Sequence, residues 1–355
     1  MIQIMNIPHN IYIHVPFCVK KCQYCAFYSH PCANPDWDEY ADKIIDEIEH
    51  FGNILGKLTV PTIFFGGGTP SLMPVATFEK IINAIKNHFD LSPDAEITIE
   101  ANPGTITADK LDDFCKIGLN RLSVGVQSFD DEKLKFLGRI HTANDAIKLL
   151  DAGLKRGLRV SGDFIYGLPG EGITDIIETC NKINNIGISH CSMYELTIEP
   201  NTPFGKMNLC MPTNEIMAEM YMAIGTRLAL PRYEVSNYAR PGQECRHNQN
   251  VWDGDAYIGI GDGAAGRVFM NGVWYEQLGG NKMFNPMTNE SRAIERVITG
   301  MRTMRGVLVD ETVQKIINIE FAKSHPDMLM FDGKRIHATD KGILVLDDLI
   351  TKLVK

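Results

Sequence analysis

Six short apolar runs alternate with segments of helical periodicity through the first 230 residues of the chain. The runs begin at Ile11, Thr62, Glu96, Arg121, Leu158 and Ser189, and each ends in a turn or glycine signal. Amphipathic segments begin at Asp36, Ala76, Thr142 and Ile173. Strands and helices that alternate about every 30 residues are typical of parallel βαβ units. The pattern predicts an α/β fold, with a partial or full α/β barrel favoured over an open doubly wound sheet, although the pattern alone fits both.

The pattern changes after residue 230, where Gly, Asn and aromatic residues become frequent. We expect residues 233–266 to form irregular backbone that packs against the barrel. The stretch after about Ser291 predicts a small helical or winged-helix-like domain, and its last apolar helix, from Gly342, is expected to pack in the core. We therefore predict three parts: a barrel core over 1–230, a barrel-covering segment over 231–290, and a small C-terminal domain over 291–355.

Composition limits the classes of function open to the 355-residue chain, which carries a formal net charge of −9. That acidic balance disfavours broad electrostatic capture of nucleic acid, so we expect no nucleic-acid partner. No apolar run reaches the roughly 20 residues that span a bilayer, and no signal peptide is evident at the start, so a cytoplasmic location is expected. Nine cysteines without a secretory signal make a disulfide framework improbable.

Three of the cysteines form the motif C-x3-C-x2-C in IYIHVPFCVKKCQYCAFYS, directly after the first predicted strand. Closely spaced thiolates are soft ligands that select zinc or iron–sulfur clusters. Structural zinc needs four ligands, and a second pair of cysteines is missing here, although His14, His30 or Cys32 could supply the fourth. The alternatives are a 4Fe–4S cluster held by Cys18, Cys22 and Cys25 with one iron left open, or a trio of purely structural thiols.

This motif at the end of the first barrel strand resembles the signature of the radical S-adenosylmethionine (SAM) superfamily. The resemblance implies a partial (β/α)6 TIM-like barrel and a 4Fe–4S cluster whose open iron chelates the amino and carboxylate groups of SAM. It also implies a reducing electron donor, because one electron from the cluster cleaves the sulfonium of SAM to a 5′-deoxyadenosyl radical.

The resemblance extends to further positions at successive strand ends. The segment GGGTPS resembles the family's contact with the methionine amino group through Gly67, Gly68 and Thr69. Tyr24 resembles the aromatic placed against the adenine, and its other reading is an aromatic lid over the cluster. The remaining positions that match cofactor contacts are Tyr12, Glu100, Gln127, Arg139 and Asp163. Carboxylates and an amide suit a ligand with an amine and a ribose, and arginine can hold a carboxylate bidentately.

The chain as a whole resembles the anaerobic coproporphyrinogen III oxidase-like family. Its decarboxylases carry a further cysteine two places after the third cluster cysteine and a longer amino-terminal arm, whereas Phe27 stands there in this chain and seventeen residues precede Cys18. Both departures favour the haem chaperones of the same family, whose C-R-H-N-x-x-Y-W segment corresponds to residues 245–252, with Val251 replacing tyrosine. The resemblance implies that His247 helps to bind haem, since neutral imidazole is a common axial ligand, with Cys245 as a competing thiolate.

The resemblance thus predicts a haem chaperone with a 4Fe–4S cluster, SAM and haem as cofactors, and it leaves open whether the chain is an enzyme. Implied partners are haem-accepting respiratory proteins and the electron donor, and both a peripheral membrane contact and a dimer are compatible with it. The alternatives are an oxygen-independent coproporphyrinogen III oxidase, a radical SAM enzyme that modifies RNA, and a zinc-binding interaction module. The segment GDGAAG lacks the strand, helix and acidic residue of a dinucleotide-binding fingerprint.

Overall fold

The computed structural model describes residues 7–278 and 283–355, and the six predicted strands are all present. They are β1 (His9–Val15), β4 (Thr59–Gly67), β5 (Asp90–Ala101), β6 (Arg121–Gln127), β7 (Arg159–Tyr166) and β8 (His190–Glu195). The helices between and after them are α1 (Trp37–Leu55), α2 (Val75–His88), α3 (Ala108–Ile117), α4 (Asp131–Phe136), α5 (Ala143–Lys155), α6 (Ile173–Ile186) and α7 (Asn214–Arg227). Two-residue strands β2 (Phe17–Cys18) and β3 (His30–Pro31) flank the cysteine loop.

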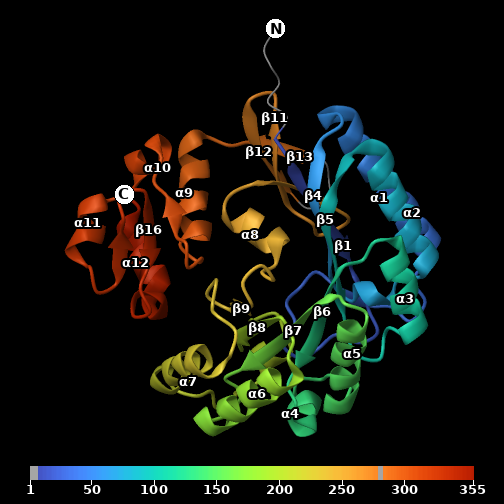
Figure 1. Cartoon of the computed structure of the whole chain (residues 1–355), viewed down its shortest axis with the longest axis horizontal. Helices are drawn as coiled ribbons and strands as arrows, with labels where there is room; N and C mark the ends of the chain where they lie inside the picture. The colour runs from blue at the N-terminus through green and yellow to red at the C-terminus, as the bar shows by residue number, and fades with distance from the viewer. Residues whose placement is uncertain (1–6, 279–282) are drawn as a thin grey trace.

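The six strands pair in parallel and in sequence order inside one eleven-stranded sheet. Its order is β13-β12-β11-β10-β1-β4-β5-β6-β7-β8-β9, which adds β9 (Asn237–Ala239), β10 (Ala256–Ile260), β11 (Gly266–Met270), β12 (Val273–Leu278) and β13 (Met283–Pro286). The sheet curves into an arc with the helices along its outer side (Figure 1). In the described part of the chain its end strands β13 and β9 do not pair with each other, so the fold is the partial α/β barrel that the resemblance implied.

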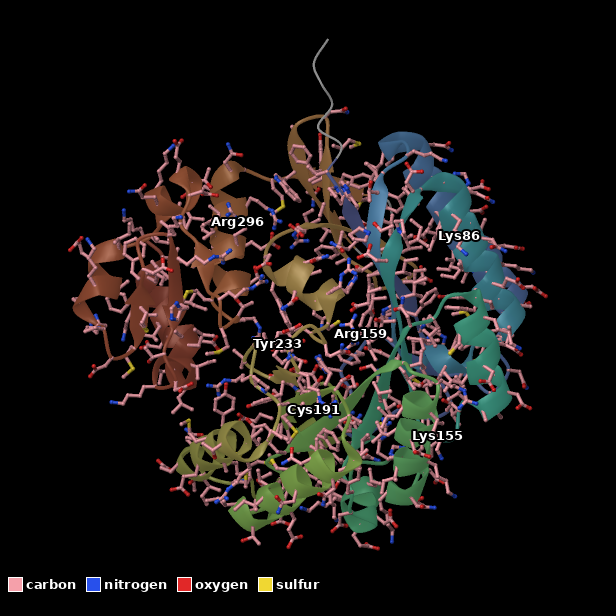
Figure 2. All side chains as sticks on the ribbon, viewed as in Figure 1. Lys86, Lys155, Arg159, Cys191, Tyr233 and Arg296 are labelled. Carbon is pink, nitrogen blue, oxygen red and sulfur yellow. The ribbon has the colours of Figure 1, made fainter. Side chains whose placement is uncertain are left out.

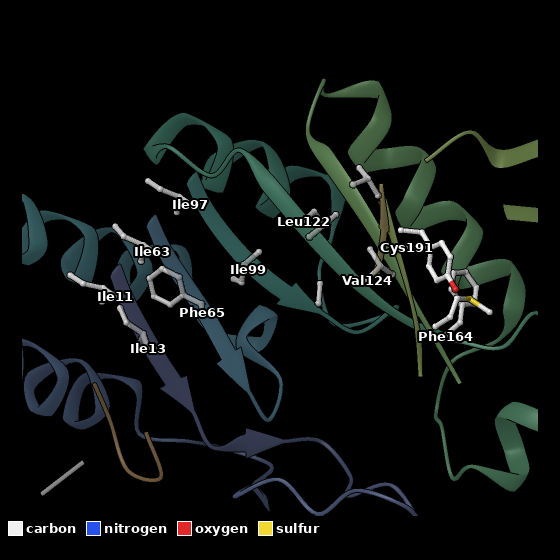
Figure 3. Packing of buried hydrophobic residues seen from close by; sticks show 14 of the residues in the cluster. Ile11, Ile13, Ile63, Phe65, Ile97, Ile99, Leu122, Val124, Phe164 and Cys191 are labelled. Atoms are coloured by element: carbon white, nitrogen blue, oxygen red, sulfur yellow. The ribbon is translucent and has the colours of Figure 1, made fainter. Parts of the chain in front are cut away.

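Alternate residues along each strand face opposite sides of the sheet. Ile63 and Phe65 of β4 and Ile97 and Ile99 of β5 belong to the buried apolar cluster beneath the outer helices (Figure 3). On the parallel strands, the residues that alternate with such outward-facing apolar positions point into the arc, and most of them are polar. They include Asn10, Thr62, Glu96, Thr98, Arg121, Ser123, Ser161, Asp163, His190 and Ser192. Because buried polar groups cost free energy unless they find partners, this lining predicts a binding site on the concave side.

The prediction of irregular backbone over 233–266 is wrong in three places, the first being β9, which pairs with β8. A short helix, α8 (Arg246–Trp252), occupies the middle of the arc, and β10 joins the sheet as a parallel neighbour of β1 (Figure 1). Gly259 weakens the strand signal of β10, but a Cβ at this position would come within 2.3 Å of the Ala265 carbonyl oxygen. Glycine is therefore required there by close backbone approach.

The C-terminal region contains helices and a small sheet, as predicted. Its elements are α9 (Asn289–Gly300), β14 (Val307–Leu308), α10 (Glu311–Ile316), α11 (Ile319–Ser324), β15 (Leu329–Phe331), β16 (Arg335–Ala338) and α12 (Leu346–Leu353). The three strands form an antiparallel sheet in the order β14-β16-β15. Helix α12 buries Leu349 and Leu353, which confirms its role in core packing. The boundaries at residues 230 and 290 stay a prediction, and no helix of the described residues is long and apolar enough to cross a bilayer.

Candidate functional site

A cavity of about 450 Å³ opens at the carboxyl ends of the parallel strands, the edge where such folds build their sites. Eleven of the thirteen predicted site residues line it. They are Cys18, Cys22, Tyr24, Cys25, Gly67, Gly68, Thr69, Glu100, Gln127, Arg139 and Asp163. The positions come from five different strands or the loops after them, so the fold brings together residues up to 145 positions apart (18 to 163).

The three motif cysteines lie on the loop after β1, at the rim of this cavity. Cys18 is buried, whereas Cys22 and Cys25 are half-buried, and all three are free thiols. Among the described residues no three His, Cys, Asp or Glu side chains converge closely enough to hold a single metal ion. A 4Fe–4S cluster takes each thiolate on a different iron, so a spread trio around a cavity suits a cluster. Burial raises the pKa of Cys25, and the neighbouring Cys22 and Cys18 add to this, which iron coordination would offset.

The three candidates for a fourth zinc ligand do not line the cavity. Both ring nitrogens of His14 are already hydrogen-bonded, Nδ1 with the Tyr12 hydroxyl at 3.0 Å and Nε2 with the Tyr28 carbonyl at 2.7 Å. His30 is exposed and packs edge-on against Phe17, with ring centroids 5.4 Å apart. Cys32 donates its backbone N–H to the Cys18 carbonyl at 2.9 Å and is only half-buried. The site therefore has three thiols spread around an open cavity, and none of the three candidate fourth ligands lines that cavity.

The glycine segment after β4 lies directly against the cysteine loop. A Cβ at Gly68 would stand 3.0 Å from the sulfur of Cys18 and 2.7 Å from the Phe17 carbonyl oxygen. Gly67 has φ +112°, and a Cβ there would collide with the His14 ring at 2.6 Å. Only glycine allows the backbone to approach so closely. The backbone N–H of Gly67 donates to Glu100 Oε2 at 3.1 Å, which ties the loop to β5.

Glu100 and Asp163 form a pair of carboxyl groups across the cavity. Burial, with a contribution from Asp163, raises the pKa of Glu100 to about 8. Burial also raises the pKa of Asp163, although three serine hydroxyls donate to it: Ser123 at 2.8 Å, Ser161 at 3.2 Å and Ser192 at 2.8 Å. A cationic ligand that reaches these carboxyl groups would favour their ionised forms.

The end of β6 carries backbone strain. Gln127 has φ +64°, and the register between β6 and β7 shifts at this point. A left-handed conformation at a non-glycine residue is unfavourable and is found mostly at functional sites. Arg139 spans the same corner, because it donates to the sulfur of Cys22 at 3.4 Å and to the Gly125 carbonyl at 3.0 Å. It also donates to Asn102, so one guanidinium links the cysteine loop to strands β5 and β6.

Several cavity residues were not singled out from the sequence as ligand contacts. The main ones are Asn102, Arg121, Ser123, His190, Ser192, Tyr194, Asn237 and Asn248. Most lie at alternate positions of β6 and β8, so the period of two within each strand was the signal that could have found them. Asn248 comes instead from α8, which reaches the cavity only in the folded chain.

Two predicted site residues lie outside the cavity wall. Tyr12 packs on the ring of Phe64 and against Gly66, where a Cβ would come within 2.9 Å of its ring. His247 is 5% exposed and does not line the cavity, and its ring lies 5.2 Å from that of Phe64, which does. Contact of Tyr12 with SAM and of His247 with haem stay predictions.

Helix α8 is held in the arc by a buried carboxylate. Glu96 of β5 accepts the backbone N–H of Arg246 at 3.1 Å and of His247 at 2.9 Å, and it forms an ion pair with Arg159 at 2.7 Å. Arg159 and Tyr233 lie beside α8 near the middle of the molecule, whereas Lys86 and Lys155 lie on outer helices (Figure 2). The thiol of Cys245 is fully buried next to Glu96, and burial raises its pKa to about 12. A thiol in this state is a poor candidate for a haem ligand.

Comparisons with known proteins agree with this site. The family model described as "Radical SAM superfamily" matches residues 12–183. A protein named Heme chaperone HemW from Escherichia coli is 39% identical, and the match covers 74% of this chain and 70% of the relative. Heme chaperone HemW from Lactococcus lactis is 31% identical over 98% of this chain and 97% of the relative. The chain therefore belongs to the radical SAM superfamily.

Within that superfamily, the chain belongs to the family of the curated proteins named Heme chaperone HemW. The solved structure of coproporphyrinogen III oxidase (HemN) from Escherichia coli, described as a radical SAM enzyme, covers 98% of this chain and 90% of its own. Its TM-score is 0.81 at 22% sequence identity, which shows a shared fold. Membership of the radical SAM superfamily implies a 4Fe–4S cluster and SAM, and the cysteine loop and the glycine segment fit these groups.

Proposed function

We propose that this protein is a haem chaperone that binds a 4Fe–4S cluster, SAM and haem, and that it delivers haem to respiratory haem proteins. The observation that carries the proposal is the full-length likeness to a curated Heme chaperone HemW, at 31% identity over 98% of this chain. Cys18, Cys22 and Cys25 would hold the cluster, and the residues at the ends of β4 to β7 would hold SAM. The cluster would supply one electron and an open iron to SAM.

The residues of this chain would bind and orient the cofactor. Glu100 and Asp163 offer carboxyl groups to its cationic part, and Arg139 holds the cysteine loop in register through Cys22. Tyr24 lines the cavity between two of the cysteines and would either face the adenine or cover the cluster. The Phe27 side chain, 66% exposed at the cavity mouth, stands where the decarboxylases carry a further cysteine, which supports the chaperone reading.

The hydrogen bonds of His247 suit a role as a haem ligand. The Thr62 hydroxyl donates its one hydrogen to Asn10 Oδ1 at 2.8 Å, so Thr62 Oγ1 accepts from His247 Nδ1 at 2.8 Å. Nδ1 then carries the hydrogen and Nε2 keeps its lone pair, the tautomer found in most metal-binding histidines. Burial lowers the pKa of His247 to about 4, which keeps the ring neutral. Because the ring is buried and does not line the cavity, ligation requires neighbouring side chains such as Phe64 to move.

The test is a titration of the anaerobically reconstituted protein with haemin, followed by mixing with a haem-depleted respiratory haem protein. We expect a Soret band that is altered in His247→Ala, and transfer of haem to the acceptor. An unaltered band in His247→Ala would remove this residue from the site. Absence of both binding and transfer by the unmodified protein would refute the proposal.

An oxygen-independent coproporphyrinogen III oxidase is the alternative, because the chain shares its fold with HemN. An anaerobic assay with coproporphyrinogen III, SAM and a reductant separates the two functions. Formation of protoporphyrinogen at an ordinary turnover rate would favour the oxidase. A radical enzyme that modifies RNA is less well supported, since the chain carries a net charge of −9.

A further inference from the structure

Arg121 is a buried cation on the floor of the cavity whose guanidinium has no hydrogen bond within the described residues. It is the first residue of β6, it is 2% exposed, and it lines the cavity. A guanidinium carries five N–H donors in a planar fork. In the described chain, the side-chain nitrogens that are both without a hydrogen bond and fully inaccessible do not include those of Arg121. Its guanidinium nitrogens are therefore accessible, and they open onto the cavity that Arg121 lines. Buried donors without acceptors are costly, and a ligand that supplies acceptors would relieve that cost.

The groups around Arg121 do not form hydrogen bonds with its guanidinium. Glu96 and Asp163 attract it electrostatically, but Glu96 accepts from Arg159 and from two backbone N–H groups of α8. Asp163 accepts from three serine hydroxyls. Glu100 also interacts with Arg121, and its Oε2 accepts the Gly67 N–H. Cys245 and Tyr233, which face Arg121 too, stay uncharged because burial raises the pKa of each.

The nearby histidines are uncharged as well. Burial, helped by the charge of Arg121, lowers the pKa of His190, and burial lowers that of His247 to about 4 with Arg121 adding to the effect. The other basic residues of the cavity differ from Arg121: Lys21 and Arg139 are hydrogen-bonded, and Lys20 is exposed at the mouth. Arg121 is thus the buried cation of the described cavity whose N–H groups have no hydrogen-bond acceptor among the described residues.

The depth of Arg121 restricts the ligand. Gln127 lies six positions further along β6, which is roughly 20 Å at about 3.3 Å per residue. By the strand register, Phe64 lies level with Arg121, and Ile165 and Tyr194 lie just beyond the level of Gln127, so apolar or aromatic side chains line both ends of this span, with Ser123 and Asp163 between them. A ligand that reaches Arg121 from the opening and contacts the apolar side chains at both ends therefore needs a long, largely apolar body with an anionic group at its inner end. A carboxylate matches the fork, because two parallel N–H···O bonds can form.

We propose that Arg121 binds a carboxylate at the inner end of the ligand that this cavity receives, and that a haem propionate is that carboxylate. The inference rests on the proposed function and adds the anchoring group to it. Haem has an apolar macrocycle with two propionates, which is the chemistry that the wall and the floor recognise. SAM also carries a carboxylate, so the experiment needs an arm that separates the two ligands.

The unmodified protein can be tested first, by comparing haemin with haemin dimethyl ester, whose propionates are blocked. We expect haemin to bind about tenfold to a hundredfold more tightly, as judged by Soret titration, because a hydrogen bond to a charged group is lost in the ester. In Arg121→Gln the difference between acid and ester should shrink to about twofold, while SAM affinity stays within about twofold. Arg121→Lys keeps the charge without the fork and should fall between the two.

Arg305→Gln is the matched control, because Arg305 is an exposed arginine that pairs with Asp253 away from the cavity. It should retain the full preference for haemin over the ester. The inference is overturned if the unmodified protein binds haemin and the ester equally, or if Arg121→Gln weakens both equally. It is also overturned if Arg121→Gln weakens SAM but not haemin. Absence of any haemin binding by the unmodified protein would overturn the proposed function and this inference with it.

Discussion

Glu100 shows how one side chain can couple ligand binding to protons. Its carboxyl group is held by the Gly67 N–H and lies in the cavity with Asp163. Burial raises the pKa from the ordinary 4.5 to about 8, with Asp163 adding to the effect. The folded chain therefore holds a proton that the unfolded chain releases. The stability that this contributes is complete below pH 4.5 and is lost as the pH rises through about 8.

We predict that SAM binding at pH 7 releases close to one proton per site. At that pH about 90% of Glu100 is protonated, and a cationic ligand would favour the carboxylate. Isothermal titration of the cluster-loaded protein in buffers of different ionisation enthalpy measures the release. Glu100→Gln should release almost none and bind SAM about tenfold more weakly. Glu132→Gln, an exposed carboxylate on α4, serves as the control, and undiminished release in Glu100→Gln would contradict the prediction.

Helix α8 is too short to be stable by itself, so its place in the arc depends on the contacts at its first turn. Glu96 provides these contacts from β5. Burial would raise its pKa, but Arg121 and the N–H groups of α8 outweigh this and lower it. The carboxylate is therefore ionised near neutrality, and the stability that it contributes is lost when the pH falls below its ordinary value of 4.5.

We predict that Glu96→Gln lowers the free energy of unfolding by about 3–5 kcal/mol, because it removes a buried carboxylate that pairs with the half-buried Arg159 and attracts the buried Arg121. Urea unfolding measures the loss, and amide exchange at Arg246 and His247 should become faster. Asp94→Asn is the control, since Asp94 pairs with Arg246 on the surface at 3.1 Å and is 77% exposed. Its loss should be about 0–1 kcal/mol. Equal effects of the two substitutions would show that the buried contact is not special.

The segment between α7 and β10, residues 228–255, links the C-terminal region to the barrel. The C-terminal region contacts this segment through main-chain bonds, from Met304 N–H to the Tyr233 carbonyl at 3.0 Å and from Val235 N–H to the Arg302 carbonyl at 3.1 Å. An ion pair between Arg302 and Glu234 at 2.6 Å adds to it. The same segment carries α8 and Asn248 to the cavity, so ligand binding and the packing of the C-terminal region share one connection.

We predict that SAM stabilises the whole cluster-loaded chain, by about 2.7 kcal/mol when SAM is present at 100 times its Kd. Thermal unfolding under anaerobic conditions measures the shift in Tm. Serine at Cys18, Cys22 or Cys25 should abolish the iron content and the SAM-dependent shift. Cys32→Ser should behave as the unmodified protein does, because Cys32 does not line the cavity. Loss of iron in Cys32→Ser would assign that thiol to the cluster instead.

The sequence by itself determined the features that depend on near neighbours. The six parallel strands follow from apolar runs and turns, and the cysteine trio follows from a spacing within eight residues. The tertiary structure decided the rest, because it depends on residues far apart in the chain. His247 meets Thr62 across 185 positions and Asn250 meets Asn10 across 240, so neither the burial of His247 nor the place of α8 could be read from local pattern. Arg121 likewise looks like an ordinary strand residue until β7, β8 and α8 enclose it, since burial and the loss of water are properties of the packed molecule.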